Sequence, residues 1–135
     1  LFEGDALVAE YAISSAANGI GFEEGSYCTP TGRFEVSEKI GDGEALGTIF
    51  KSRKPMGVWD GTPSDDDMIL SRILRLNGLD AQNANSMERY IYIHGTNHEA
   101  LLGGPSSHGC IRMANADIVE LFDRIELGAP LLIGY

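Results

Sequence analysis

The chain has 135 residues, 43% of them hydrophobic, and a formal net charge of −10 at pH 7. This length predicts one domain over residues 1–135 with a substantial core. The acidity argues against a nucleic-acid binder or a partner of anionic membrane surfaces. No apolar run reaches the ~18 residues of a membrane span, and no signal peptide is visible after Leu1. Two cysteines are too few for a disulfide scaffold.

Short apolar runs separated by glycine and other turn residues predict many short strands. Alternation of apolar and polar residues predicts a strand over 6–13 and a clearer one over 33–40. Further strands are expected over 47–51 and 90–93, and a final core strand over 129–133. These elements indicate a mainly β chain.

One helix is expected near the C-terminus, with Asn115 as its N-cap and Gly128 just beyond its end. Its apolar residues recur at helical spacing and form one stripe. They are Ile118, Leu121, Phe122 and Ile125. The rest of the chain adds at most one more short helix.

The segment 64–76 is ambiguous. Ser64 followed by three aspartates resembles a helix start, whereas residues 68–76 also fit a long strand beside 89–93. Residues 57–67 and 77–86 are expected to be loops, and the first has a composition that also suits a lid over a site.

Two smaller features have ordinary explanations. The basic residues Lys51, Arg53 and Lys54 are expected to form a solvated surface cluster. Cys28 is expected to be a small buried side chain, with a redox role as the alternative. A disulfide to Cys110 that switches the protein off would require the two cysteines to lie close together.

The chemistry is concentrated in Ser107-His108-Gly109-Cys110-Ile111-Arg112-Met113 and in His94-Gly95-Thr96 upstream. A thiol is a weak nucleophile until a base removes its proton, and an imidazole at contact distance is such a base. The two segments therefore predict a cysteine enzyme.

The residues around the thiol suggest further roles. Gly109 lets the backbone approach a substrate closely, so the N–H groups of Gly109 and Cys110 are candidate oxyanion donors. Arg112 lies two residues beyond Cys110, and in an extended segment both side chains point to the same face. Arg112 is then able to hold a substrate carboxylate, with a structural ion pair as the alternative.

These segments resemble the signature of the L,D-transpeptidase catalytic domain, also called the YkuD domain. The stretch Thr29-Pro30-Thr31-Gly32-Arg33-Phe34 resembles the strand entry of the same family. The resemblance covers nearly the whole chain. It implies a β-rich α+β fold, a partly closed β-sandwich of mixed sheets with one or two short flanking helices, and it favours the strand interpretation of 68–76.

The resemblance also implies roles for single residues. Cys110 is the acyl-enzyme nucleophile, and His94 is the base, oriented by the backbone carbonyl of Gly95. His108 lines the site and helps to position it, and Gly109 contributes to the oxyanion hole. Contacts with the substrate are expected from three further residues. They are Arg112, Ser107 and Thr96.

The reaction that the resemblance implies is acyl transfer from a peptidoglycan stem tetrapeptide. Cys110 attacks the carbonyl of meso-diaminopimelate and releases terminal D-alanine, and an amine accepts the acyl group. With water as acceptor the enzyme is an L,D-carboxypeptidase that trims muropeptides to tripeptides. Carbapenem-type β-lactams are expected covalent inhibitors. We expect a monomer without cofactor or metal, in the cell envelope, or in the cytoplasm because no signal peptide is visible.

Two rival interpretations come from different classes of protein. His94, His98, His108 and Cys110 form a His/Cys set of the kind that binds zinc, but without the compact spacing of known zinc motifs. His98, between polar neighbours, is expected to be an exposed loop residue. A binding module that has lost its chemistry is disfavoured because the nucleophile and the base are both present.

Overall fold

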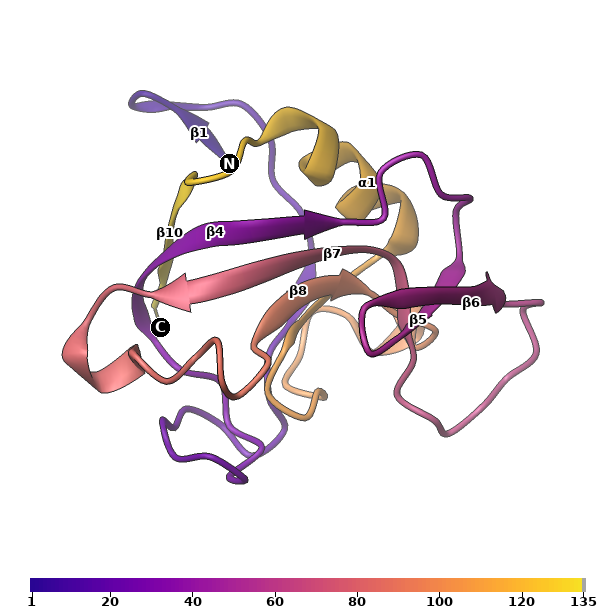
Figure 1. The fold of residues 1–135 in the computed structure, drawn as a ribbon, viewed down its shortest axis with the longest axis horizontal. Coiled ribbons are helices and arrows are strands. Elements are labelled where there is room, and N and C mark those ends of the chain that lie inside the picture. The colour runs from indigo at the N-terminus through magenta and orange to yellow at the C-terminus, as the bar shows by residue number, and fades with distance from the viewer. Residues whose placement is uncertain (135) are drawn as a thin grey trace.

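Strand β7 (Ile69–Gly78) is the centre of the fold. β8 (Tyr92–Gly95) pairs along one edge of it, and β4 (Gly32–Ile40) and β5 (Thr48–Lys51) share the other, all three antiparallel. The computed structural model describes residues 1–134. Figure 1 shows these strands as one curled sheet, with helix α1 lying against one face.

The strands β3 (Ile13–Ser14), β6 (Lys54–Val58), β9 (Ile111–Met113) and β10 (Pro130–Ile133) complete an eight-stranded sheet. Its path is β10-β4-β7-β8-β9-β3, with the β5–β6 hairpin attached to β7. β8 and β9 run parallel, and the other pairs are antiparallel. The strands β1 (Phe2–Glu3) and β2 (Ala6–Leu7) form a separate antiparallel pair. The helical elements are the 3₁₀ helices η1 (Ala81–Asn83) and η2 (Glu99–Leu101) and the α-helix α1 (Asn115–Arg124). The expected β-rich fold with mixed sheets is confirmed.

A bulge in β7 makes the sheet curl. The register with β8 shifts between Leu70 and Ile73, and Ser71 has φ 71°, in the left-handed region. A bulge bends its strand and increases the local twist. β5 pairs before this bulge and β4 after it, so two strands fit along one edge of β7.

The two faces of the sheet separate the main core from the candidate site. Ile93 and Ile111 pack in the large hydrophobic core with residues of α1. Tyr92 and Ile73 form a second, smaller cluster against which Cys110 packs. Because successive side chains of a strand point to opposite faces, the thiol lies on the face of β8 that α1 does not cover.

The prediction of one strand over residues 6–13 is wrong. The structure has two short strands there, β2 and β3, with irregular backbone between them. Leu7 and Ile13 are 57% and 44% exposed. The alternating apolar residues therefore have no buried face that would hold them in a single strand.

Two other strands differ in their bounds or setting. The strand expected over 90–93 begins only at Tyr92, because Tyr90 has φ 57°, a left-handed conformation that does not fit a strand. The strand expected over 129–133 forms as β10, but it pairs only with β4 within the described residues. Leu131 and Ile133 pack against the main core while Leu132 is 73% exposed, so β10 is an edge strand with one face on the core.

The strands expected over 33–40, 47–51 and 68–76 are confirmed as β4, β5 and β7. The two predicted loops are shorter than expected, because β6 extends to Val58 and β7 to Gly78. Residues 59–68 remain without helix or strand, while η1 lies within 77–86.

The C-terminal helix forms as predicted, but its start differs. Asn115 is the first helical residue, and Ala114 before it makes no side-chain cap. The Asn115 side chain instead accepts from the Ser71 hydroxyl and donates to the Thr96 carbonyl. It therefore ties α1 to β7 and to the His-Gly-Thr segment. Within residues 1–134, no helix is both long enough and apolar enough to cross a membrane.

Candidate active site

The Cys110 thiol lies at the start of β9 and contacts the backbone of the neighbouring segment. It donates to the Tyr90 carbonyl at 3.3 Å and accepts from the Tyr92 N–H at 3.4 Å. Burial raises the pKa of the Cys110 thiol to about 11. The thiol is therefore protonated in this arrangement and needs a base before it can attack.

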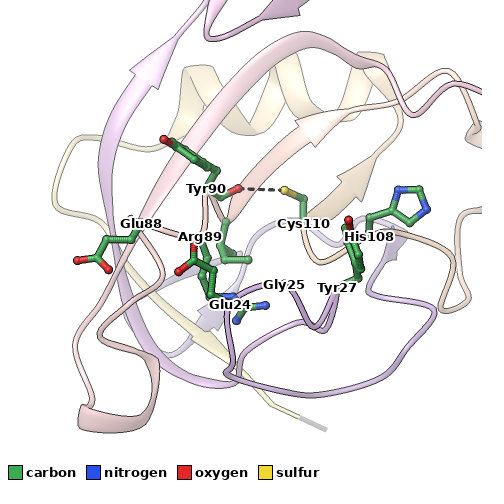
Figure 2. A pocket seen from close by; sticks show the side chains of 9 residues that line it. Glu24, Gly25, Tyr27, Glu88, Arg89, Tyr90, His108 and Cys110 are labelled. Carbon is green, nitrogen blue, oxygen red and sulfur yellow. Dashed lines mark hydrogen bonds between the residues drawn. The ribbon is translucent and has the colours of Figure 1, made fainter.

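A pocket of about 250 Å³ opens beside this thiol. Its wall combines residues from the 24–27 loop, the segment before β8 and the Ser-His-Gly-Cys turn (Figure 2). The side chains that line it include Glu24, Tyr27, Glu88, Arg89, Tyr90, His108 and Cys110. The predicted nucleophile is thus accessible from a cavity rather than sealed in the core.

The turn before Cys110 has a backbone that only certain residues adopt. Gly109 has φ 126°, which is unfavourable for a residue with a side chain. The Thr29 hydroxyl donates to the Gly109 carbonyl at 2.9 Å, and the Ser107 hydroxyl donates to the Cys110 carbonyl at 2.6 Å. The Gly109 N–H donates to the Ser107 oxygen at 3.2 Å. These bonds fix the backbone position of Cys110.

His94 is buried, with 1% of its surface exposed. Its Nδ1 lies 2.6 Å from the Gly95 carbonyl oxygen. Burial lowers the pKa of His94, partly offset by the Gly95 carbonyl and by Asp67. Since a carbonyl only accepts, Nδ1 carries the proton and Nε2 keeps its lone pair. The expected contact between the base and the Gly95 carbonyl is present.

Gly95 has a steric role as well. A Cβ at this position would lie 2.6 Å from the Leu70 carbonyl oxygen and would overlap the Asn115 side chain. Real Cβ atoms do not tolerate such a distance, so a larger residue would push β8 away from β7 and α1. The glycine after His94 is therefore required by packing.

His94 and Cys110 lie on the same face of the sheet but are not hydrogen-bonded. In the parallel β8–β9 register His94 pairs with Arg112 and Ile93 with Ile111. Cys110 precedes that register and lies diagonally across from His94. Among residues 1–134, the thiol makes no hydrogen bond to His94 or to His108. The thiol is turned toward the Tyr90 carbonyl instead.

Asp67 joins two residues of the Ser-His-Gly-Cys-Ile-Arg segment. One carboxylate oxygen lies 2.8 Å from Arg112 Nη2, and the other lies 3.2 Å from His108 Nδ1. The Arg112 side chain is 2% exposed, and it also donates to the Ser106 carbonyl at 3.0 Å. Arg112 therefore has a structural ion pair in this structure, the alternative to a substrate contact.

The other residues expected to contact substrate are also buried. Thr96 is fully buried and its hydroxyl accepts from the His98 N–H. Ser107 is 2% exposed and its hydroxyl is engaged in the turn around Gly109. His108, in contrast, has a side chain that is 64% exposed and lines the pocket. Of the predicted site residues, His108 and Cys110 face the pocket.

The segment after His94 holds the 59–68 loop. His98 Nε2 lies 2.7 Å from the Ser64 carbonyl oxygen, and Asn97 donates to the Asp66 carbonyl at 2.9 Å. The Met68 N–H donates back to Asn97. The expectation of an exposed His98 is wrong, because this contact half-buries it. The loop is thereby fixed with Asp67 next to the site.

Sequence reasoning missed Asp67 and Tyr90. Asp67 is the last of three consecutive aspartates, and nothing in the sequence distinguishes it from the other two. Tyr90 was counted as a strand residue, but it lines the pocket and supplies the carbonyl that holds the thiol. Its position next to the strand that carries His94 was the one available signal.

Within residues 1–134 the structure shows the surroundings of Cys28 and of the histidines of the zinc hypothesis. Cys28 and Cys110 are both free thiols. Cys28 is half-buried, and its sulfur contacts the carbonyls of Asn18 and Ser26. The described residues contain no group of three or more His, Cys, Asp or Glu side chains arranged to hold a metal ion. His98 and His108 turn to Ser64 and Asp67 instead.

A thiol on a pocket wall and a buried histidine on the same sheet face have the composition of a cysteine-type active site. The chain belongs to the L,D-transpeptidase catalytic domain family, also called YkuD, whose sequence pattern matches residues 1–133. It is 35% identical over 105 residues to "Putative L,D-transpeptidase YqjB" of Bacillus subtilis strain 168. That match covers 78% of this chain and 51% of the relative. The chain thus spans about half the length of this curated relative.

The fold is also that of solved L,D-transpeptidases. An L,D-transpeptidase from Mycobacterium smegmatis superposes with a TM-score of 0.58 at 17% identity, covering 95% of this chain and 49% of that one. L,D-transpeptidase 3 from Mycobacterium tuberculosis, solved with a faropenem-derived adduct, gives a TM-score of 0.56 at 19% identity. That superposition covers 100% of this chain and 50% of the other. At these identities the likeness concerns the fold.

Proposed function

We propose that this protein is a cysteine-dependent acyl transferase that acts on peptidoglycan stem tetrapeptides. The observation that carries the proposal is the position of Cys110. It opens into a pocket on the same sheet face as His94, a buried imidazole whose Nδ1 is held by the Gly95 carbonyl. Family membership supplies the substrate class.

In the first step, His94 Nε2 takes the proton of Cys110 as the sulfur attacks the carbonyl carbon of meso-diaminopimelate. A C–S bond forms, and the carbonyl electron pair moves to its oxygen. The Cys110 N–H is the candidate donor to that oxyanion, since the Gly109 N–H is engaged by the Ser107 hydroxyl. The C–N bond to terminal D-alanine then breaks, and His94 returns the proton to the leaving amine. The product is a thioester on Cys110.

The resting thiol needs the histidine for this step. Its pKa of about 11 leaves almost no thiolate at neutral pH. The Tyr90 carbonyl accepts the thiol proton in the resting arrangement but is too weak a base to remove it. Rotation of the Cys110 side chain toward His94, which is diagonal to it across the parallel β8–β9 pair, would bring an imidazole base to the sulfur.

In the second step an acceptor attacks the thioester. An amine from a second stem peptide gives a crosslink and regenerates the Cys110 thiol. Water gives the tripeptide instead, which is L,D-carboxypeptidase activity. The pocket beside Cys110 is open to solvent along the exposed side chains of Tyr27 and Tyr90. We propose the amine as the principal acceptor.

The same nucleophile is expected to open β-lactams. The Mycobacterium tuberculosis relative that shares this fold was solved with a faropenem-derived adduct. A strained lactam carbonyl that enters the pocket of Cys110 would form a thioester in the same way as a stem peptide.

Product analysis tests the proposal. A disaccharide-tetrapeptide is incubated with the protein, with and without a D-amino acid, and the products are identified by mass spectrometry. A dimer or an exchanged tetrapeptide supports acyl transfer to amines, and tripeptide alone identifies a carboxypeptidase. Unchanged tetrapeptide in both reactions, with folded protein, would contradict the proposed function.

A further inference from the structure

We propose that Arg53, at the tip of the β5–β6 hairpin, binds a carboxylate of the donor stem peptide. The assignment deepens the proposed function and rests on it. It also replaces the sequence-based expectation for Arg112, whose guanidinium is buried against Asp67. Two carboxylates of the donor lie near the scissile bond, at the peptide terminus and on the diaminopimelate side chain.

The backbone at the hairpin tip is unfavourable for an arginine. Lys51 pairs with Lys54, so Ser52 and Arg53 form a two-residue turn. Their φ angles are 49° and 64°, both left-handed. Such a turn is most often Asn-Gly, because glycine adopts this conformation without steric cost. Glycine would fit this position best, so the presence of an arginine indicates that the Arg53 side chain has a function.

The guanidinium of Arg53 is held in place by two tyrosine side chains. Its Nη1 donates to the Tyr92 hydroxyl at 3.2 Å. Its central carbon lies 5.6 Å from the centre of the Tyr90 ring, an arrangement that favours a cation over the ring face. Arg53 is half-buried against these rings. The other N–H groups of the Arg53 guanidinium are therefore held in one direction before any ligand binds.

Arg53 also differs from the other arginines in its partners. Within residues 1–134, its guanidinium has no carboxylate within ion-pair distance and donates to no backbone carbonyl. The arginines paired with a carboxylate are Arg33, Arg75, Arg112 and Arg124. The arginines bound to backbone carbonyls are Arg72 and Arg89. Arg53 is therefore the arginine whose guanidinium is best able to donate to an anion from outside the protein.

The tyrosines that hold Arg53 also contact the nucleophile. The Tyr90 carbonyl and the Tyr92 N–H are the two groups bonded to the Cys110 sulfur. Cys110 packs against a cluster formed by Tyr92 and Phe50, and Phe50 belongs to the hairpin strand β5. Arg53 is not part of the pocket lining, but Tyr90 both lines the pocket and lies beneath the Arg53 guanidinium. A peptide whose scissile carbonyl reaches Cys110 and whose neighbouring groups extend past Tyr90 would meet the hairpin. A charge-assisted bond to Arg53 would fix its register.

The test uses three tetrapeptides in which the terminal carboxylate, the side-chain carboxylate or neither is converted to a carboxamide. Arg53→Gly is the decisive variant, because glycine suits the left-handed turn and the protein should fold at least as well as before. Lys54→Gln is the matched control, since it removes the same charge from the same hairpin. Both are compared with the unchanged protein by kcat/KM for release of the terminal D-residue.

The unchanged protein should prefer the free carboxylate over one of the two carboxamides by about ten- to a hundredfold, the usual value of a charge-assisted bond. Arg53→Gly should reduce that preference to about twofold or less, while Lys54→Gln keeps it. The carboxamide substitution that lowers kcat/KM identifies which carboxylate Arg53 binds. Equal loss in both variants, or no preference in the unchanged protein, would overturn the assignment.

A binding measurement separates this inference from the proposed function. The same three peptides are titrated calorimetrically into Cys110→Ala protein, with and without Arg53→Gly. If the unchanged protein lacks turnover but Cys110→Ala still shows the Arg53-dependent preference, the proposed function fails and the carboxylate site stands. If turnover is present and the preference does not depend on Arg53, the inference alone fails. Absence of binding to all three peptides overturns both.

Discussion

The two sides of Cys110 are built differently. Behind it lie the buried side chains of His94 and Arg112 and the half-buried carboxylate of Asp67. The Gly95 carbonyl holds His94, and Arg112 and Asp67 form an ion pair. In front of it lies an open pocket lined by the exposed ring of Tyr90, and half-buried Arg53 lies outside the pocket, over that ring. The charged groups on the buried side already have hydrogen-bond or ion-pair partners in the protein. Groups on the open side still have hydrogen-bonding capacity for a substrate.

This difference separates the residues that we assign to the chemical step from those that we assign to substrate recognition. Unpaired charges are costly inside a protein, so buried residues must satisfy one another before the substrate arrives. Arg112 illustrates the rule, since its ion pair with Asp67 leaves little of it for a ligand. We therefore assign chemistry and support to the buried side, and substrate selection to the open side.

The largest expected effect is at the nucleophile. Cys110→Ala should reduce turnover of the tetrapeptide to background, because no other group lies where the acyl intermediate forms. Mass spectrometry of the products measures this. Cys28→Ala is the matched control and should retain activity, since its sulfur is hydrogen-bonded to the carbonyls of Asn18 and Ser26 and Cys28 does not line the pocket at Cys110. Equal activity of Cys110→Ala and the unchanged protein would remove Cys110 from the mechanism.

The second effect concerns the base. His94→Ala should lower kcat by about 10²- to 10⁴-fold, the usual contribution of general acid–base catalysis. His108→Ala should cost less, because that side chain is largely exposed and bonded to Asp67 rather than held by a backbone carbonyl. Steady-state kinetics of the two variants decides the assignment. A larger loss for His108→Ala would make His108 the base.

The third effect tests the buried side by stability. Asp67→Asn leaves Arg112 buried without its carboxylate and should lower the free energy of unfolding by about 3 kcal/mol. Glu120→Gln is the control, since it removes one partner of an exposed pair with Arg124 and should cost under about 0.5 kcal/mol. Urea unfolding measures both. Similar costs for the two variants would contradict the buried ion pair.

The fourth and smallest effect is on the pH dependence of stability. Burial raises the pKa of Cys110 in the folded protein to about 11, from an ordinary thiol value of 9.0. Between these values the unfolded chain has lost the thiol proton while the folded chain keeps it, so this thiol makes stability fall as pH rises from about 9 to 11. Cys110→Ala should show a shallower decline than the unchanged protein in urea titrations. Parallel curves would mean that the thiol is not buried as described.

The motif residues and most strands were accessible from the sequence. His94, Gly95, His108 and Cys110 occur in two short segments whose chemistry is recognisable without a structure. The alternating pattern of β4 also predicted its strand, because one face of β4 is buried and the other is not.

Other features could not be predicted, for physical reasons. β7 is buried on both faces along much of its length, so its sequence has no alternation that separates strand from helix. Asp67 and Arg53 acquire their roles from distant partners, Arg112 and Tyr92, that only the folded sheet brings close. Local sequence patterns contain no information on such pairs.

The most direct measurement of the central claim is the intact mass of the protein during reaction. After a short incubation with disaccharide-tetrapeptide or with a penem, the account predicts one added acyl group per chain. Peptide mapping should locate it on Cys110, and Cys110→Ala protein should not gain it. An adduct located on Cys28, or turnover without any adduct on Cys110, would contradict the account.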